Sequence, residues 1–181
     1  MEVKFLGSFK DNFPKDGKRH VVFVGRSNVG KSSLINMMVG RKVAKVSKEP
    51  GRTRSVNFFL FEGLYLVDLP GYGFAKVSRV EREEWRGMIE GYFSSCWEDI
   101  KLVFLLIDSL VGPTEPDLEA LQWLQAWKLP YVIVLTKGDR VGQRELHQTL
   151  SKIRQCAKGD LLITSSKEGK GKREIMRYVL S

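Results

Sequence analysis

Residues 25–32, with the sequence GRSNVGKS, fit the spacing Gly-x-x-x-x-Gly-Lys-Ser. An apolar run precedes them and a helical pattern follows, which is the context in which such a loop surrounds phosphate oxygens with backbone N–H groups. We expect the Lys31 ammonium to reach the β- and γ-phosphates of a nucleotide and the Ser32 hydroxyl to ligate Mg²⁺. The alternative, a glycine turn with a solvent-facing lysine, leaves the later motifs unexplained. The predicted phosphate-binding residues are Gly25, Ser27, Asn28, Val29, Gly30, Lys31, Ser32, Ser33 and Gly71.

A second short motif, DLPG at residues 68–71, follows the apolar run 64–67. Ligands of open α/β sheets bind at the carboxyl ends of the strands. Asp68 is therefore placed to hold Mg²⁺ through a water, and the Gly71 N–H to face the γ-phosphate. Asp-x-Pro-Gly also forms plain turns, but its position after the phosphate loop favours the metal and γ-phosphate interpretation.

Two later strand ends predict which base is bound. In TKGD, residues 136–139, the Asp139 carboxylate can accept hydrogen bonds from guanine N1–H and the exocyclic amine, whereas adenine would leave it unpaired. The Lys137 stem can lie along the base, and the Ser166 N–H in TSSK can meet guanine O6, with Ser165 supporting the loop. Each tetrapeptide alone is typical of a polar turn, but their order after the phosphate loop predicts GTP. The predicted guanine-binding residues are Thr136, Lys137, Asp139, Thr164, Ser165 and Ser166.

A hydroxyl between the first helix and the next strand is expected to complete the Mg²⁺ shell. Position favours Thr53 for this over Ser47 and Ser55. The predicted metal ligands are Ser32, Thr53 and, through water, Asp68. A loop of this kind is ordered with GTP and released after hydrolysis. The predicted switch residues are Gly51, Arg52, Thr53, Asp68, Leu69, Pro70, Gly71 and Tyr72.

Alternating apolar runs and helical patterns must position these motifs. Strands are predicted at residues 20–25, 55–61, 64–69, 101–108, 131–136 and 161–164, and helices at 31–40, 81–97, 114–127, 143–157 and 172–180. Continuously apolar strands between helices indicate a mostly parallel sheet covered on both faces. The pair Glu62-Gly63 marks a hairpin that makes one edge strand antiparallel. The predicted fold class is α/β, a three-layer P-loop NTPase of the Ras-like G-domain type with a six-stranded sheet.

Composition limits the remaining classes. The 181 residues suit one domain, no apolar run approaches the roughly 18–20 residues of a membrane span, and the N-terminus lacks the apolar region of a secretory signal. We interpret Cys96 and Cys156 as reduced thiols in a cytosolic protein rather than as a disulfide. A net charge of +9 favours a polyanionic partner over a generally basic surface.

The motifs together resemble those of the EngB family, also called YihA or YsxC, of bacterial ribosome-biogenesis GTP-binding proteins. The resemblance rests on residues 23–36, 50–59, 68–78, 135–139 and 164–171, in family order over nearly the whole chain. "PGRT…NFF" and "DLPGYG.AKVS" are specific to this family among the GTPases. The departures are small: Arg54 stands where a glutamine is common, and Gly138 and Arg140 stand where an alanine and a lysine often occur.

This resemblance implies one G domain, residues 19–181, with an N-terminal extension, residues 1–18, packed on or beside it. It implies a cytoplasmic protein that acts in assembly of the large ribosomal subunit, contacting rRNA and ribosomal proteins but not DNA, and that is needed for normal cell division and septation. We expect a monomer, because the sequence shows no apolar excess that would mark a large interface. The alternative is a GTP/GDP-dependent interaction protein with a protein or cell-division target, in which hydrolysis is incidental. A metabolic P-loop kinase would need an acceptor site and lid that this motif set does not show.

Tyr72 occupies the place where many Ras-like GTPases carry a glutamine that orients the attacking water. An aromatic ring cannot do this, so we expect slow hydrolysis and a ring that points away from the γ-phosphate. In related GTPases with a hydrophobic residue here, an asparagine at the position of Asn28 helps to hold K⁺, which supplies positive charge near the phosphates. The other interpretation of Asn28 is a loop residue that tolerates an unusual backbone conformation.

Basic residues gather in two segments. Residues 41–54 contain Arg41, Lys42, Lys45, Lys48, Arg52 and Arg54, and the C-terminal segment contains Lys167, Lys170, Lys172, Arg173 and Arg177. A basic loop that also senses nucleotide can couple GTP to RNA contact, which would make binding steeply salt-dependent. The alternative is a set of solvated faces that form no single patch.

Overall fold

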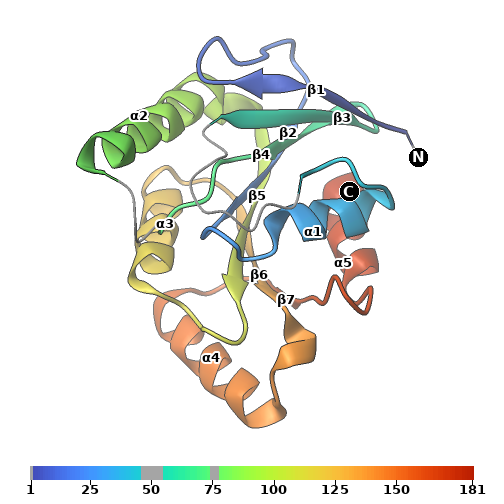
Figure 1. Cartoon of the computed structure of the whole chain (residues 1–181), viewed down its shortest axis with the longest axis vertical. Coiled ribbons are helices and arrows are strands. Elements are labelled where there is room, and N and C mark those ends of the chain that lie inside the picture. The colour runs from blue at the N-terminus through green and yellow to red at the C-terminus, as the bar shows by residue number, and fades with distance from the viewer. Residues whose placement is uncertain (1, 46–54, 74–77) are drawn as a thin grey trace.

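The computed structural model describes residues 2–45, 55–73 and 78–181. Within these ranges one seven-stranded sheet has the order β1-β3-β4-β2-β5-β6-β7 (Figure 1). Strand β3 runs antiparallel to β1 and β4, and the remaining neighbours pair in parallel. The strands are β1 Val3–Phe9, β2 His20–Gly25, β3 Val56–Phe61, β4 Leu64–Asp68, β5 Ile100–Asp108, β6 Tyr131–Thr136 and β7 Leu161–Ile163.

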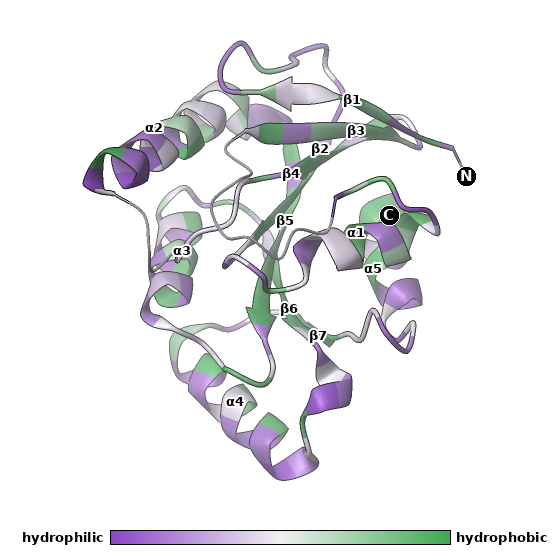
Figure 2. Ribbon diagram, in the orientation of Figure 1, coloured by the Kyte–Doolittle hydropathy of each residue, from purple (hydrophilic) through white to green (hydrophobic). Residues whose placement is uncertain are grey.

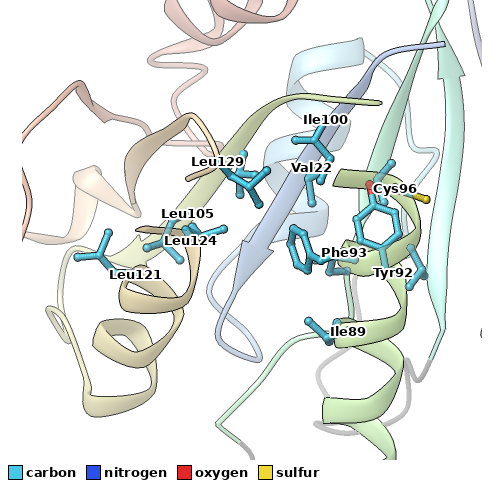
Figure 3. Packing of buried hydrophobic residues seen from close by; sticks show 14 of the residues in the cluster. Val22, Ile89, Tyr92, Phe93, Cys96, Ile100, Leu105, Leu121, Leu124 and Leu129 are labelled. Carbon is cyan, nitrogen blue, oxygen red and sulfur yellow. The ribbon is translucent and has the colours of Figure 1, made fainter. Parts of the chain in front are cut away.

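Helices cover both faces of this sheet, and hydrophilic residues cover the outer sides of the helices (Figures 1 and 2). One apolar cluster joins the sheet to α1 and α5, and a second joins its other face to α2, α3 and α4. Figure 3 shows Phe93 of α2 below Val22 of β2, and Leu124 of α3 beside Leu105 of β5. The helices are α1 Lys31–Val39, α2 Arg79–Cys96, α3 Glu115–Ala126, α4 Gln143–Cys156 and α5 Lys172–Leu180, with short 3₁₀ turns at Trp97–Asp99 and Gly138–Arg140.

Local sequence explains where two helices begin. Ser78 accepts a hydrogen bond from the Glu81 N–H at 3.1 Å, and its own N–H donates to the Glu81 carboxylate, so the two residues form a capping box at the start of α2. The Asp117 carboxylate accepts from the Thr114 N–H and hydroxyl, both at 2.9 Å, at the start of α3. These bonds satisfy backbone donors that a helix leaves unpaired at its first turn.

The predicted three-layer α/β architecture with a mostly parallel sheet is confirmed, but the predicted number of six strands is wrong. Residues 3–9 form β1, which pairs antiparallel with β3 and covers the edge that the hairpin was expected to leave. The sequence VKFLGSF hides this strand because most of its side chains are exposed, so it lacks the alternation of a half-buried strand. The antiparallel strand is therefore β3, one place in from the edge.

A buried histidine lies where β2 meets the second apolar cluster. His20 is 0% exposed; its Nδ1 lies 2.8 Å from the Tyr92 hydroxyl, and its Nε2 has no hydrogen-bond partner among the described residues. Its ring packs against Phe58, Tyr65 and Tyr92. Burial lowers the pKa of His20 to about 4, so the imidazole is neutral at physiological pH.

Candidate nucleotide-binding site

The loop that joins β2 to α1 has the backbone conformation that its glycines allow. Gly30 has φ 103°, a left-handed conformation, and Asn28 has φ 65°. Gly25 lacks room for a side chain, because a Cβ there would lie 2.8 Å from Val29 Cγ1. The loop therefore turns tightly and leads directly into α1, whose N-terminal N–H groups favour anions.

The lysine of this loop meets the aspartate at the end of β4. Lys31 Nζ lies 2.5 Å from Asp68 Oδ1, and the two side chains are only 11% and 6% exposed. The sheet order explains the contact, since β2 and β4 are parallel neighbours and their carboxyl ends lie side by side. The structure thus brings the predicted phosphate lysine and the predicted metal acid to one point.

The DLPG segment lies against the backbone of the phosphate loop. The Ser27 N–H donates to Tyr72 O at 2.8 Å, and the Tyr72 N–H donates to Gly25 O at 3.2 Å. A Cβ on Gly71 would lie 3.0 Å from both Ser27 N and Ser27 Cα. Gly71 is therefore required for its small size, and the N–H of Ser27, a predicted phosphate-binding residue, is here bonded to Tyr72, the residue after the DLPG segment.

The Tyr72 side chain points into the protein interior. It is 6% exposed, and its hydroxyl donates to Asp117 Oδ1 at 2.6 Å. Burial, followed by the negative charge of Asp117, raises the pKa of Tyr72 far above its ordinary value, so the phenol stays protonated. On the α2 side, Trp85 Nε1 donates to Pro70 O at 3.0 Å. The segment after β4 is thus bonded to both α2 and α3.

The two predicted base-reading loops lie next to each other after β6 and β7. The Ser165 hydroxyl donates to Asp139 Oδ1 at 2.8 Å, and the Gly138 N–H donates to Thr164 O at 2.9 Å. The Ser165 hydrogen bond lowers the pKa of Asp139, which keeps this carboxylate ionised and able to accept hydrogen bonds. Ser166 is half-buried beside them. The geometry fits an acceptor for the polar edge of a base.

Three of the predicted guanine-binding residues also connect these loops to the rest of the site. The buried Thr136 hydroxyl donates to Val29 O at 2.6 Å, and the Thr164 hydroxyl donates to Leu135 O at 3.2 Å. Lys137 Nζ donates to Asn28 O and to Asp108 Oδ2, each at 2.9 Å. The Thr136 and Lys137 bonds fix the distance between the base-reading loops and the phosphate loop, and the Thr164 bond joins the ends of β6 and β7.

Sequence reasoning missed three residues that shape the site. Asp108 pairs with Lys137, Asp117 holds Tyr72, and the Asn36 amide bonds to Val43 N, Ala44 N and Ala44 O at 2.8–2.9 Å. Asp108 carried a signal, because an acid ends an apolar strand there. The roles of Asp117 and Asn36 depend on contacts across elements, which the sequence pattern does not contain.

Part of the predicted switch lies outside the described residues, namely Gly51, Arg52 and Thr53. Of the predicted metal ligands, Asp68 ends β4 and Ser32 is the second residue of α1. A hydroxyl and a carboxylate fit Mg²⁺, a hard cation that takes its other ligands from phosphates and water. No cluster of three or more His, Cys, Asp or Glu suited to a metal occurs in the described ranges. Ser32 and Asp68 would supply two of the ligands, so phosphates and water would have to supply others.

A large hollow lies between α2 and α3 and adjoins the segment after β4, since Leu69, Pro70 and Tyr72 also line it. Its volume is about 1200 Å³, and Trp85, Met88 and Trp123 are among its lining residues. The predicted base-reading residues and Lys31 do not line it. We place the nucleotide at the strand ends, because the charged and backbone groups suited to phosphate and base converge there.

The fold and the strand-end residues define a P-loop GTP-binding protein, and a family model described as 50S ribosome-binding GTPase matches residues 20–137. The probable GTP-binding protein EngB of Aquifex aeolicus is 52% identical over 183 residues, which is 100% of both chains. The chain belongs to the EngB family of GTP-binding proteins. A second relative, the probable GTP-binding protein EngB of Thermotoga maritima, is 44% identical and spans 93% of this chain and 88% of its own.

Solved structures agree with the fold. A crystal structure of a probable GTP-binding protein EngB has a TM-score of 0.74 at 24% identity, covering 89% of this chain and 96% of that one. Aquifex aeolicus Era bound to GDP and AlF₄⁻ has a TM-score of 0.69 at 26% identity, covering 89% and 55% of the two chains. Membership of a GTPase family supports GTP hydrolysis and GTP or GDP as the ligand, usually with Mg²⁺. None of the described helices could cross a membrane.

Proposed function

We propose that this protein is a GTP-dependent switch with slow intrinsic hydrolysis that acts on the large ribosomal subunit, or its precursor, during assembly. The observation that carries the proposal is the position of Tyr72. Its backbone is bonded to the phosphate loop, while its side chain is bonded to Asp117 in the interior. The segment that faces the γ-phosphate is thus linked to α3, but it offers no side chain at this position to orient water.

The catalytic parts have separate roles in this proposal. Lys31 stabilises charge on the β- and γ-phosphates, the Gly71 N–H faces the γ-phosphate, and Ser32 with Asp68 holds Mg²⁺, directly and through water. Thr53, which lies outside the described residues, completes the shell. Mg²⁺ held by these residues would supply positive charge that neutralises the negative charge developing on the phosphates. Without a water-orienting glutamine, turnover is expected to resemble the slow intrinsic GTPases rather than stimulated ones.

A monovalent cation is the proposed source of additional positive charge. The left-handed Asn28 backbone, with φ 65°, supports the conformational role of this residue, and K⁺ binding by its amide is a separate proposal. Turnover in K⁺ and Na⁺ should be compared for wild type and Asn28→Gly, since glycine keeps the backbone conformation without the amide. Higher turnover in K⁺ that disappears in the variant supports the cation; equal rates in both salts exclude it.

The ribosomal target is supported by the family description, 50S ribosome-binding GTPase, and by the net charge of +9. Co-sedimentation with large subunits and their precursors tests it, with a non-hydrolysable GTP analogue, GDP or no nucleotide. We expect retention with the GTP analogue only. Retention on a cell-division protein but not on particles would support the alternative target instead. The protein is proposed to be a cytoplasmic monomer, with residues 19–181 as the G domain and an N-terminal extension, residues 1–18, packed on or beside it.

A further inference from the structure

The fold brings part of the two basic segments together on one surface. A Cβ on Gly40, which directly follows α1 and caps it, would lie 3.7 Å from Lys172 Nζ at the start of α5. Ala44 belongs to the same apolar cluster as Ile175 of α5, and Val43 packs against that cluster. Figure 1 shows α1 and α5 side by side. We call this surface the α1–α5 basic face and define it by Arg41, Lys42, Lys45, Lys172 and Arg173.

The charges of this face are exposed and unopposed. All five basic side chains are exposed, and no ion pair found between described residues includes any of them. Glu174 is the only acid in residues 40–45 and 170–177. Lys172 and Arg173 lie in the first turn of α5, where the helix dipole disfavours cations by about 0.3–1 kcal/mol each. An anionic partner would offset this cost.

The face is also held in a fixed shape. The Asn36 amide accepts from the Val43 and Ala44 N–H groups at 2.9 and 2.8 Å and donates to Ala44 O at 2.9 Å. Asn36 lies in α1, whose first residues belong to the phosphate loop. The phosphate-binding end and the basic end are thus opposite ends of one helix about 13 Å long.

We propose that the α1–α5 basic face binds the phosphate backbone of double-stranded RNA, which in the proposed function is an rRNA stem. Unpaired bases are bound by stacking on exposed aromatic side chains, and the exposed aromatic residues in the described ranges, Phe5 and Trp97, lie outside this face. A-form duplexes are instead recognised by shape and phosphate contacts. The α1–α5 basic face has closely spaced cations on a rigid backbone and no exposed aromatic residue, which fits recognition of a duplex through its phosphates.

The test compares two charge reversals of equal size. The face variant is Lys42→Glu/Lys172→Glu/Arg173→Glu. The matched control is Arg144→Glu/Lys152→Glu/Lys158→Glu, on and after α4, where all three side chains are exposed. The probe is an RNA duplex of about 16 base pairs, with one of its strands alone and with anionic phospholipid vesicles as competitors. Binding of a fluorescent GDP checks that each variant is folded.

We expect the face variant to lose at least about tenfold in duplex affinity and to lower the salt slope by about 2–3, one unit for each phosphate contact removed. The control should stay within about twofold of wild type in this sequence-independent electrostatic assay. Equal losses in both variants, preference for the single strand or for vesicles, or an unchanged salt slope would overturn the proposal.

This inference rests on the proposed function only for the source of the RNA, so the two can fail separately. If wild type binds the duplex through this face but is never retained on ribosomal particles, the ribosomal function fails and the RNA face stands. If, with the GTP analogue, ribosomal particles retain the face variant to the same extent as wild type, the proposal of an RNA-binding face fails and the ribosomal function stands.

Discussion

The Tyr72 hydroxyl donates a 2.6 Å hydrogen bond to Asp117 Oδ1, and this bond joins the residue after the DLPG segment to the first turn of α3. The other oxygen of Asp117 accepts from Thr114, so the same carboxylate caps the helix. Movement of the segment upon nucleotide exchange would therefore disturb a helix cap. This relation gives α3 a direct means of responding to the nucleotide.

Removing this hydrogen bond should destabilise the protein. Tyr72→Phe leaves the buried Asp117 oxygen without its donor, which we expect to lower the free energy of unfolding by about 1–3 kcal/mol. Urea denaturation measures the change. Tyr131→Phe is the matched control, because its hydroxyl makes only exposed hydrogen bonds at 3.2 and 3.5 Å, and should cost about 0.5 kcal/mol or less. Equal losses would show that the Asp117 contact has no special weight.

The close approach of Gly71 to the phosphate loop can be tested with one methyl group. Gly71→Ala places a Cβ 3.0 Å from Ser27 N and Cα, which costs about 1–3 kcal/mol of overpacking. We expect GTP affinity to fall about tenfold or more, with a smaller loss for GDP, which has no γ-phosphate. Gly87→Ala is the control, since nothing lies within 4 Å of its Cβ, and unchanged nucleotide affinity is expected. A Gly71→Ala protein with normal GTP affinity would refute the γ-phosphate contact.

The hydrogen bond between Ser165 and Asp139 predicts unequal roles for two neighbouring serines. Ser165→Ala removes the donor that orients the Asp139 carboxylate, so we expect guanine nucleotide affinity to fall about tenfold. Ser166 is predicted to act through its backbone N–H, which alanine retains, so Ser166→Ala should bind normally. Titration with a fluorescent GDP measures both. A larger loss of affinity for Ser166→Ala than for Ser165→Ala would contradict the roles assigned to the two serines.

The buried His20 predicts a loss of stability in mild acid. Its folded pKa of about 4 lies below the ordinary value of 6.5, so between these pH values the unfolded chain binds a proton that the folded chain does not. The free energy of unfolding is therefore unaffected by His20 above pH 6.5. It decreases by about 3 kcal/mol as the pH is lowered from 6.5 to 4, and below pH 4 protonation of His20 causes no further decrease. Urea denaturation across this range measures it.

The control uses the other histidine. His20→Gln should flatten the pH dependence between 6.5 and 4, while His147→Gln, at an exposed position, should leave it as in wild type. The Tyr65 hydrogen bond lowers the pKa of Asp16 to about 2. The stability that Asp16 contributes is therefore lost only below pH 3.8, outside the range in which His20 titrates. A His20→Gln protein with the wild-type slope would contradict this assignment.

The sequence predicted the fold class because buried parallel strands are continuously apolar and glycines mark the loops between them. It also assigned Lys31 and Asp68 to one site, but it did not predict the direct ion pair between them. Strand β1 was missed because its exposed side chains give no hydrophobic alternation. Polar contacts between elements, such as Asn36 with Ala44, depend on packing distances that a linear pattern does not contain.

Loop chemistry was predicted less completely than loop position. The motif GRSNVGKS identified the phosphate loop, but the bond from Ser27 N–H to Tyr72 O follows from the packing of the DLPG segment against it. The basic segments looked separate in the sequence and partly converge because α1 and α5 share one apolar cluster. Their convergence required the tertiary fold.

Nucleotide-dependent retention on the large ribosomal subunit precursor tests the central claim most directly, and Asp139→Asn sharpens it. This variant should prefer xanthine over guanine, because the amide reverses one of the hydrogen bonds to the base. We predict that wild type co-sediments with the precursor only with a non-hydrolysable GTP analogue, and that Asp139→Asn does so only with the corresponding xanthosine analogue. Retention of both proteins regardless of nucleotide, or of neither with its matched nucleotide, would contradict a GTP-dependent ribosomal switch.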